Sequence, residues 1–126
     1  MKLKVLLADD HVYFLDALRM VLELEPDIEV VAQVCSGTHV LQAAQKANPD
    51  VVCMDINMPG MSGVDATRML LAHLPELKVI GLSGHDDPHQ IAEMAAAGAV
   101  GYVIKCLAAD EVANAIRDVL GKKTRK

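Results

Sequence analysis

Short runs of valine, isoleucine and leucine alternate along the chain with longer stretches in which apolar residues recur every three or four positions. Runs of the first kind are typical of strands buried on both faces, and stretches of the second kind are typical of amphipathic helices. Because a helical stretch follows each run, we expect βα units and a parallel sheet. The five predicted strands are Lys4–Ala8, Glu29–Val34, Val51–Met54, Val79–Leu82 and Gly101–Ile104.

Proline, glycine and small polar residues mark the ends of the predicted helices. Ser62 is expected as the N-cap of the third helix, Pro88 as an early residue of the fourth, and Gly98 as its C-terminal cap. The predicted helices run from about Val12 to Glu25, Thr38 to Ala47, Ser62 to just before Pro75, Pro88 to Gly98, and through Val112, Ile116 and Leu120.

Charged and polar residues follow four of the five strands directly. Asp9 and Asp10 follow the first strand, Asp55 the third, Ser83 the fourth and Lys105 the fifth. Five βα units in one short chain predict an α/β fold with a doubly wound sheet, in which ligands bind beyond the carboxyl ends of the strands. We therefore expect these five side chains to share one site.

Three carboxylates at one edge of a sheet repel one another, and a cation relieves that repulsion. Mg²⁺ suits Asp10 and Asp55 together with a backbone carbonyl from the loop after Asp55, and Asp9 can act through a water. A carboxylate beside Mg²⁺ is also a nucleophile toward phosphorus. Lys105 and Ser83 then offer a positive charge and a hydroxyl to a phosphoryl group.

Composition narrows the class of protein. A chain of 126 residues, 52% of them hydrophobic, fits one folded domain, and its apolar stretches are too short to span a membrane. The three cysteines are widely spaced without a CxxC pair, which favours a reducing cytosol and a cytoplasmic location over a disulfide framework or a zinc site.

Charge is distributed unevenly along the chain. The net charge is −5, but Lys122, Lys123, Arg125 and Lys126 lie in the last five positions, leaving eight basic against 17 acidic residues elsewhere. The acidic part of the chain is not expected to bind nucleic acid, because binding of the phosphate backbone needs a basic protein surface. Residues 121–126 are interpreted as a basic tail or as the start of a linker, and residues 1–120 as the domain.

The blocks "LLADDH", "VVCMDINMPGMSG", "GLSGHDD" and "GYVIK" resemble, in order and spacing, those of the receiver domain of two-component response regulators. The resemblance covers residues 3–120. It implies a flavodoxin-like (βα)₅ fold, with strand order 2-1-3-4-5 and helices on both faces. It also implies Mg²⁺-dependent phosphorylation by a sensor histidine kinase, followed by autodephosphorylation that makes the domain a modest enzyme.

The resemblance also implies a role for each site residue. Asp55 would be the phosphoacceptor, and Asp9, Asp10 and Asp55 would hold Mg²⁺ with the backbone carbonyl of Asn57. Ser83 and Lys105 would bind the phosphoryl group. Of the remaining positions, Ser83 and Tyr102 would carry the switch to the fourth helix, fifth strand and fifth helix, and Asn57 and His85 would tune dephosphorylation. His11 is interpreted as a loop residue.

The stretch "AAAGAVGYVIKCLAADEVANAIRDVL" is similar to the LuxR-type (NarL/FixJ-like) subgroup, whose members carry a C-terminal helix-turn-helix domain. That likeness implies a transcription regulator that binds DNA only through a further domain, and truncation is the favoured interpretation of the ending "GKKTRK". A homodimer is left open. Cys106 stands where many receivers have a proline after the lysine, so we expect a trans Lys105–Cys106 bond.

Three other interpretations compete with a phosphorylated receiver. The main alternative is a receiver-like protein-interaction module that is not phosphorylated. A flavodoxin would share the sheet, but Asp9 and Asp10 would repel the FMN phosphate and aromatic residues make up only 2% of the chain. A phosphatase with an aspartyl intermediate usually needs a second acid two positions after the nucleophile, where this chain has Asn57.

Overall fold

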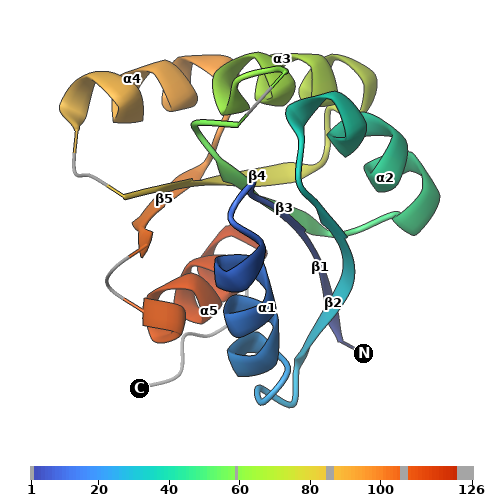
Figure 1. Cartoon of the computed structure of the whole chain (residues 1–126). Coiled ribbons are helices and arrows are strands. Elements are labelled where there is room, and N and C mark those ends of the chain that lie inside the picture. Colours follow the sequence, from blue (N-terminus) through green and yellow to red (C-terminus); the bar gives the residue numbers. More distant parts are fainter. Residues whose placement is uncertain (1, 59, 85–86, 106–107, 122–126) are drawn as a thin grey trace.

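A five-stranded parallel sheet runs through the middle of the molecule, with helices on both faces (Figure 1). The computed structural model describes residues 2–58, 60–84, 87–105 and 108–121, and the side chains of 108–110 are not described. The strand order is β2-β1-β3-β4-β5, as the resemblance implied. The strands are β1 (Leu3–Ala8), β2 (Ile28–Val34), β3 (Val51–Asp55), β4 (Lys78–Ser83) and β5 (Gly101–Ile104).

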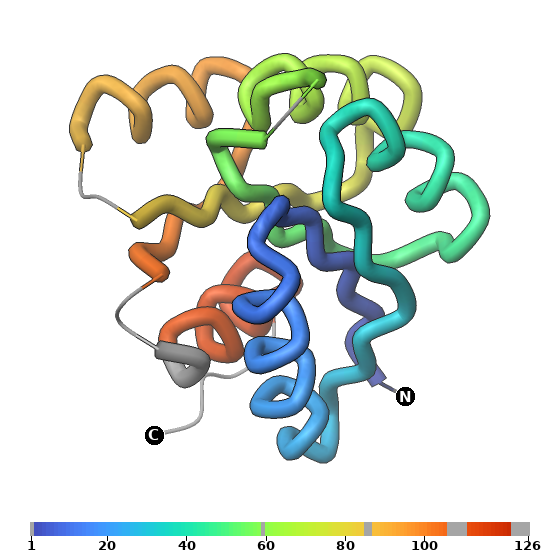
Figure 2. Tube along the Cα trace, viewed as in Figure 1, coloured from blue at the N-terminus to red at the C-terminus, as the bar shows by residue number. Residues whose placement is uncertain are grey.

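The helices form two layers. Figure 2 shows α2, α3 and α4 along one face of the sheet and α1 and α5 together on the other. Within the described residues none of these helices is both long and apolar enough to cross a membrane. The helices are α1 (Val12–Leu22), the 3₁₀ turn η1 (Gly37–His39), α2 (Val40–Ala47), α3 (Gly63–His73), α4 (Pro88–Ala97) and α5 (Ala108–Val119).

Each face of the sheet has its own hydrophobic core, because alternate residues of a strand point to opposite faces. Along β3, Val51 and Cys53 pack in the core under α1 and α5, whereas Val52 and Met54 pack in the core under α2, α3 and α4. All four side chains are completely buried. This two-sided burial explains why β3 is an almost uninterrupted apolar run.

The predicted helix caps are confirmed. The Ser62 hydroxyl accepts a hydrogen bond from the Asp65 N–H, Pro88 lies in the first turn of α4, and Gly98 ends α4 in the left-handed conformation with φ of 115°. These signals were readable because capping depends on a few neighbouring residues only.

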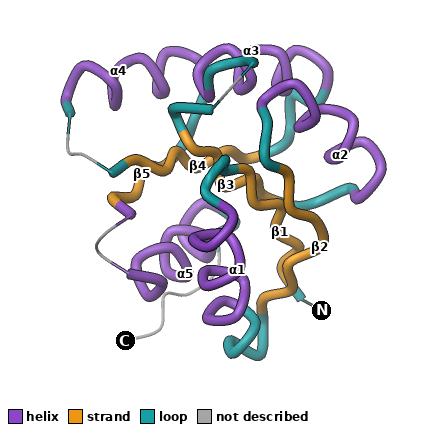
Figure 3. The backbone as a smooth tube through the Cα atoms, in the orientation of Figure 1, coloured by secondary structure: helices purple, strands orange, loops and turns teal. Residues whose placement is uncertain are grey.

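Two helix boundaries differ from the prediction. Helix α1 ends at Leu22, three residues before Glu25. The chain then turns, and backbone hydrogen bonds between residues three apart, such as that from the Glu25 N–H to the Leu22 carbonyl, stabilise the turn. The stretch predicted as one helix from Thr38 is a 3₁₀ turn followed by α2. Figure 3 shows α2 between β2 and β3. At Gly37 the backbone passes so close to the Met61 carbonyl that a Cβ there would clash. This close contact fixes the path of the chain that leads into α2.

Candidate functional site

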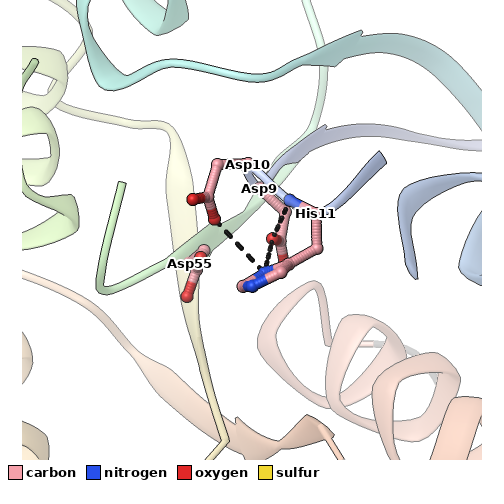
Figure 4. Close-up of side chains that lie close together, drawn as sticks. All are labelled: Asp9, Asp10, His11 and Asp55. Atoms are coloured by element: carbon pink, nitrogen blue, oxygen red, sulfur yellow. Dashed lines mark hydrogen bonds and ion pairs between the residues drawn. The ribbon is translucent and has the colours of Figure 1, made fainter. Parts of the chain in front are cut away.

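The carboxyl ends of β1 and β3 bring three aspartates together. The two strands are parallel neighbours, with Ala8 paired to Met54, so Asp9 and Asp55 emerge at the same edge of the sheet. Figure 4 shows Asp10 and His11 beside them. One ligand atom from each of these four residues lies within 4.8 Å of the others. The predicted meeting of the three carboxylates is therefore observed.

His11 joins this cluster, although the sequence placed it only in the loop before α1. Its backbone N–H donates to Asp9 Oδ1 over 2.8 Å, and its Nδ1 lies 2.9 Å from the same oxygen. Nδ1 also lies 3.2 Å from Asp10 Oδ1 (Figure 4). His11 thus fixes the direction of the buried Asp9 carboxylate, while its own ring remains two-thirds exposed.

Lys105, directly after β5, reaches across the edge of the sheet into the cluster. Its ammonium lies 2.5 Å from Asp9 Oδ2 and 3.4 Å from Asp55 Oδ1, and the side chain is only 14% exposed. A compact point charge between two carboxylates offsets part of their mutual repulsion. Lys105 thus supplies positive charge to Asp9 and Asp55.

The Asp55 carboxylate is buried, with the residue 3% exposed. Burial, and next the charge of Asp9, raise its pKa to about 6, although Lys105 and the Asn57 N–H oppose the rise. The Asn57 N–H donates to Asp55 Oδ1 over 3.4 Å. Asp55 therefore carries a destabilised negative charge at neutral pH, and a further cation or a bond to an electrophile would relieve it.

The oxygens that remain unused test whether a hard cation fits. Among the described residues, Asp9 Oδ2 and Asp55 Oδ2 are buried and accept no hydrogen bond, and for Asp9 Oδ2 the Lys105 ammonium provides charge without suitable hydrogen-bond geometry. Buried carboxylate oxygens of this kind are costly unless a cation compensates them. The donor set of oxygens suits Mg²⁺, which prefers carboxylates, carbonyls and waters.

A cavity of about 400 Å³ opens beside these groups. Asp55 and Lys105 both line it. Asn57, one of the two predicted tuning residues, also borders it. The described lining consists of His11, Phe14, Asp55, Asn57, Gly84 and Lys105.

Ser83 is the last residue of β4 and Tyr102 lies within β5, and both contact the side of the sheet that α4 covers. Ser83 is buried, and its hydroxyl donates to Gln90 Oε1 of α4 over 3.4 Å. Tyr102 is half-buried on β5 and packs with the core beneath α4, where its ring and Met94 approach the bare Cα of Gly81. A smaller cavity, of about 190 Å³, lies between Tyr102 and α4. Gln90 is a partner that sequence motifs did not indicate.

The basic tail from residue 122 onward lies outside the described part of the chain, and so do two single residues named from the sequence. They are His85, predicted to tune dephosphorylation, and Cys106, whose bond to Lys105 was expected to be trans. Both expectations stay predictions.

The doubly wound α/β sheet places a carboxylate cluster that could hold a metal ion at the edge where proteins of this class bind ligands. The comparisons with known proteins are more specific. The family model of the response regulator receiver domain matches residues 5–117. The chain belongs to this family, and it is a receiver domain of two-component response regulators.

Known relatives and solved structures agree with that assignment. The transcriptional regulatory protein DegU of Brevibacillus brevis is 40% identical over 118 residues, which are 94% of this chain and 50% of DegU. A LuxR-family two-component response regulator from Aurantimonas sp. SI85-9A1 superposes with a TM-score of 0.91 at 27% identity, over 98% of this chain and 89% of the other. The signal receiver domain of NarL from Mycobacterium tuberculosis gives 0.90 at 27% identity, over 97% and 98%.

The chain spans about half the length of the curated relatives it matches. Those relatives are transcriptional regulators, so the resemblance to the LuxR-type subgroup noted in the sequence is confirmed. What the remaining half of such a protein does is a separate matter from the receiver domain described above.

Proposed function

We propose that Asp55 accepts a phosphoryl group from the phosphohistidine of a sensor histidine kinase or from a small acyl phosphate. The observation that carries the proposal is the state of Asp55: it is buried beside Asp9, its Oδ2 accepts no hydrogen bond within the described chain, and it borders an open cavity. An oxygen of Asp55 forms a bond to phosphorus as the bond between phosphorus and the leaving imidazole or carboxylate breaks.

In this proposal Asp9, Asp10 and Asp55, with the Asn57 carbonyl, hold Mg²⁺. The bound ion would supply positive charge that offsets the carboxylates and the phosphoryl oxygens. Lys105, already 3.4 Å from Asp55 Oδ1, pairs with one of those oxygens once the phosphoryl group is present. Asn57 borders the cavity, and in this proposal Asn57 and His85 adjust the rate at which water removes the group.

The proposed switch begins at Ser83. A phosphoryl group adds charge and strong acceptor oxygens, to which the Ser83 hydroxyl turns. Turning breaks its hydrogen bond to Gln90 and frees α4, and the Tyr102 ring then moves in the cavity of about 190 Å³ beside that helix. The surface formed by α4, β5 and α5 changes shape as a result.

The output is proposed by analogy with the relatives. In a longer protein of their kind, this cytoplasmic receiver would control a C-terminal helix-turn-helix domain that binds DNA, with residues 121–126 leading toward it. The acidic body of the domain makes direct DNA binding by the receiver unfavourable. Homodimerisation of the receiver, which the sequence left open, is one way in which such control could be exerted.

Intact mass spectrometry after incubation with acetyl phosphate tests the phosphoacceptor. We expect one phosphoryl adduct that requires Mg²⁺ and is absent from Asp55→Asn. The matched control is Asp65→Asn, because Asp65 is an exposed aspartate on α3, away from the cluster. An adduct that persists in Asp55→Asn would assign the acceptor elsewhere. A native protein without any adduct would favour the protein-interaction module.

A further inference from the structure

The single phenylalanine of the chain lies against the site, and neither the sequence motifs nor the chemistry of phosphoryl transfer assigns it a role. Phe14 is on the first turn of α1, partly buried against the core beneath α1 and α5. It also lines the cavity that contains Asp55 and Lys105. Its ring therefore has one side fixed by packing and another available to the site.

The Lys105 ammonium lies over this ring, 4.9 Å from the ring centroid. That distance is within the range of about 6 Å over which an aromatic face attracts a cation. The attraction strengthens as the cation loses water, and the Lys105 side chain is only 14% exposed. Phe14 thus adds an aromatic contact to an ammonium that already pairs with two carboxylates and lies 3.4 Å from His11 Nδ1.

The position of that ammonium conflicts with a metal ion. Lys105 lies 2.5 Å from Asp9 Oδ2 and 3.4 Å from Asp55 Oδ1, which are carboxylates of the candidate metal cluster. Two cations cannot share these oxygens at close range without strong repulsion. Whatever stabilises Lys105 in this place therefore opposes the entry of a divalent ion.

We propose that Phe14 is a positioning residue: its ring holds the Lys105 ammonium among the carboxylates of the metal-free protein and thereby weakens Mg²⁺ binding. The inference rests on the proposed Mg²⁺ site and deepens it, because it makes metal affinity depend on a residue that supplies no ligand. Phe14 acts only through Lys105, so its effect must disappear when the lysine charge is removed.

The test measures the Mg²⁺ dissociation constant from backbone amide shifts in NMR titrations of the whole chain. Phe14→Leu removes the aromatic face but keeps an apolar side chain, and the constant should fall by about two- to fivefold. Phe14→Tyr retains the face and should leave the constant within about 1.5-fold of the native value. An equal change in both variants would overturn the proposal.

A double-mutant cycle separates positioning from packing. In the Lys105→Gln background, Phe14→Leu should leave Mg²⁺ affinity unchanged, because no ammonium remains for the ring to hold. An effect that survives in that background would show that Phe14 acts through the fold, and would overturn the proposal.

A third measurement uses the unsubstituted protein and needs no variant to fold. The Lys105 methylene protons nearest the ammonium should show an upfield ring-current shift in EDTA, and Mg²⁺ should diminish it. Absence of that shift in EDTA would overturn the inference. None of these readouts needs phosphorylation, so a protein that fails to form the Asp55 adduct can still support the role of Phe14, and the converse also holds.

Discussion

At the scale of single residues, the surroundings of Asp55 change the proton affinity of its carboxylate and its effect on stability. Its carboxylate is buried next to Asp9, which raises its pKa to about 6. An elevated folded-state pKa means that the folded protein holds a proton that the unfolded chain has already released. The charge of Asp55 therefore costs stability at neutral pH, and this cost is absent once pH falls below the ordinary aspartate pKa.

Asp55→Asn should consequently stabilise the metal-free protein. At pH 7.5 in EDTA we expect its free energy of unfolding to exceed the native value by about 1 to 3 kcal/mol, since the amide removes a buried charge that Lys105 only partly offsets. The gain should shrink as pH falls from about 6 to about 4, because native Asp55 then becomes protonated. Urea unfolding at several pH values measures it.

The exposed Asp65→Asn variant corrects for the general effect of replacing a carboxylate by an amide. A gain for Asp55→Asn that is equal at pH 7.5 and pH 4 would contradict the burial argument. Adding Mg²⁺ should reduce the gain at pH 7.5, because the ion stabilises only the protein that retains the Asp55 carboxylate.

At the scale of elements, the site depends on how closely α3 follows β3. The first residue of α3, Gly63, lies against the end of β3 so tightly that a Cβ would clash with the Asp55 carbonyl oxygen and the Ile56 Cα. These are backbone atoms, which cannot move aside as a flexible side chain does. The Gly63 N–H also donates to the Ile56 carbonyl over 2.7 Å. Gly63 thus fixes the loop that contains Asn57.

Gly63→Ala should therefore lower the free energy of unfolding by about 2 kcal/mol or more, because the helix must shift away from the strand. Thermal or urea unfolding of the metal-free protein measures the loss. Gly84→Ala is the matched control on the neighbouring strand end, since a Cβ there meets nothing within 4 Å. We expect it to change stability by less than about 1 kcal/mol. Similar losses in both variants would argue against close packing as the cause.

Elements are also the level at which the sequence was most informative. Buried parallel strands are continuous apolar runs, and caps such as Ser62 and Gly98 act over a few residues, so local pattern sufficed to place them. The meeting of Asp9 with Asp55 followed from the rule that parallel strands end at one edge. The ring of Phe14 under Lys105 and the bond from Ser83 to Gln90 could not be predicted, because each depends on side-chain directions between distant elements.

At the scale of the whole molecule, one buried arginine connects the last helix to the turn between α1 and β2. Arg117 on α5 is 2% exposed, and its guanidinium donates to both Asp27 oxygens over 2.9 and 2.8 Å. It also pairs with Glu25, and both acids belong to the turn between α1 and β2. The hydrogen bonds to Asp27 raise the pKa of the guanidinium above its already high value, so Arg117 stays charged at every pH of interest.

Arg117→Met keeps the apolar stem but removes the charge and its bonds across 90 residues of sequence. We expect the free energy of unfolding to fall by about 2 kcal/mol, less than for a fully buried pair, because Asp27 and Glu25 can regain water. Arg117→Lys should recover only part of the loss, since an ammonium cannot make the two-pronged contact with Asp27.

The control for this prediction is Arg68→Met, which removes an exposed i,i+3 pair with Asp65 and should cost less than about 0.5 kcal/mol. Urea unfolding in EDTA compares the three variants without interference from the metal site. If Arg117→Met lowered the free energy of unfolding no more than Arg68→Met, the ion pairs of Arg117 with Asp27 and Glu25 would contribute nothing special to stability. A larger loss would show that Arg117 anchors α5, which forms part of the proposed switch surface, to the turn between α1 and β2.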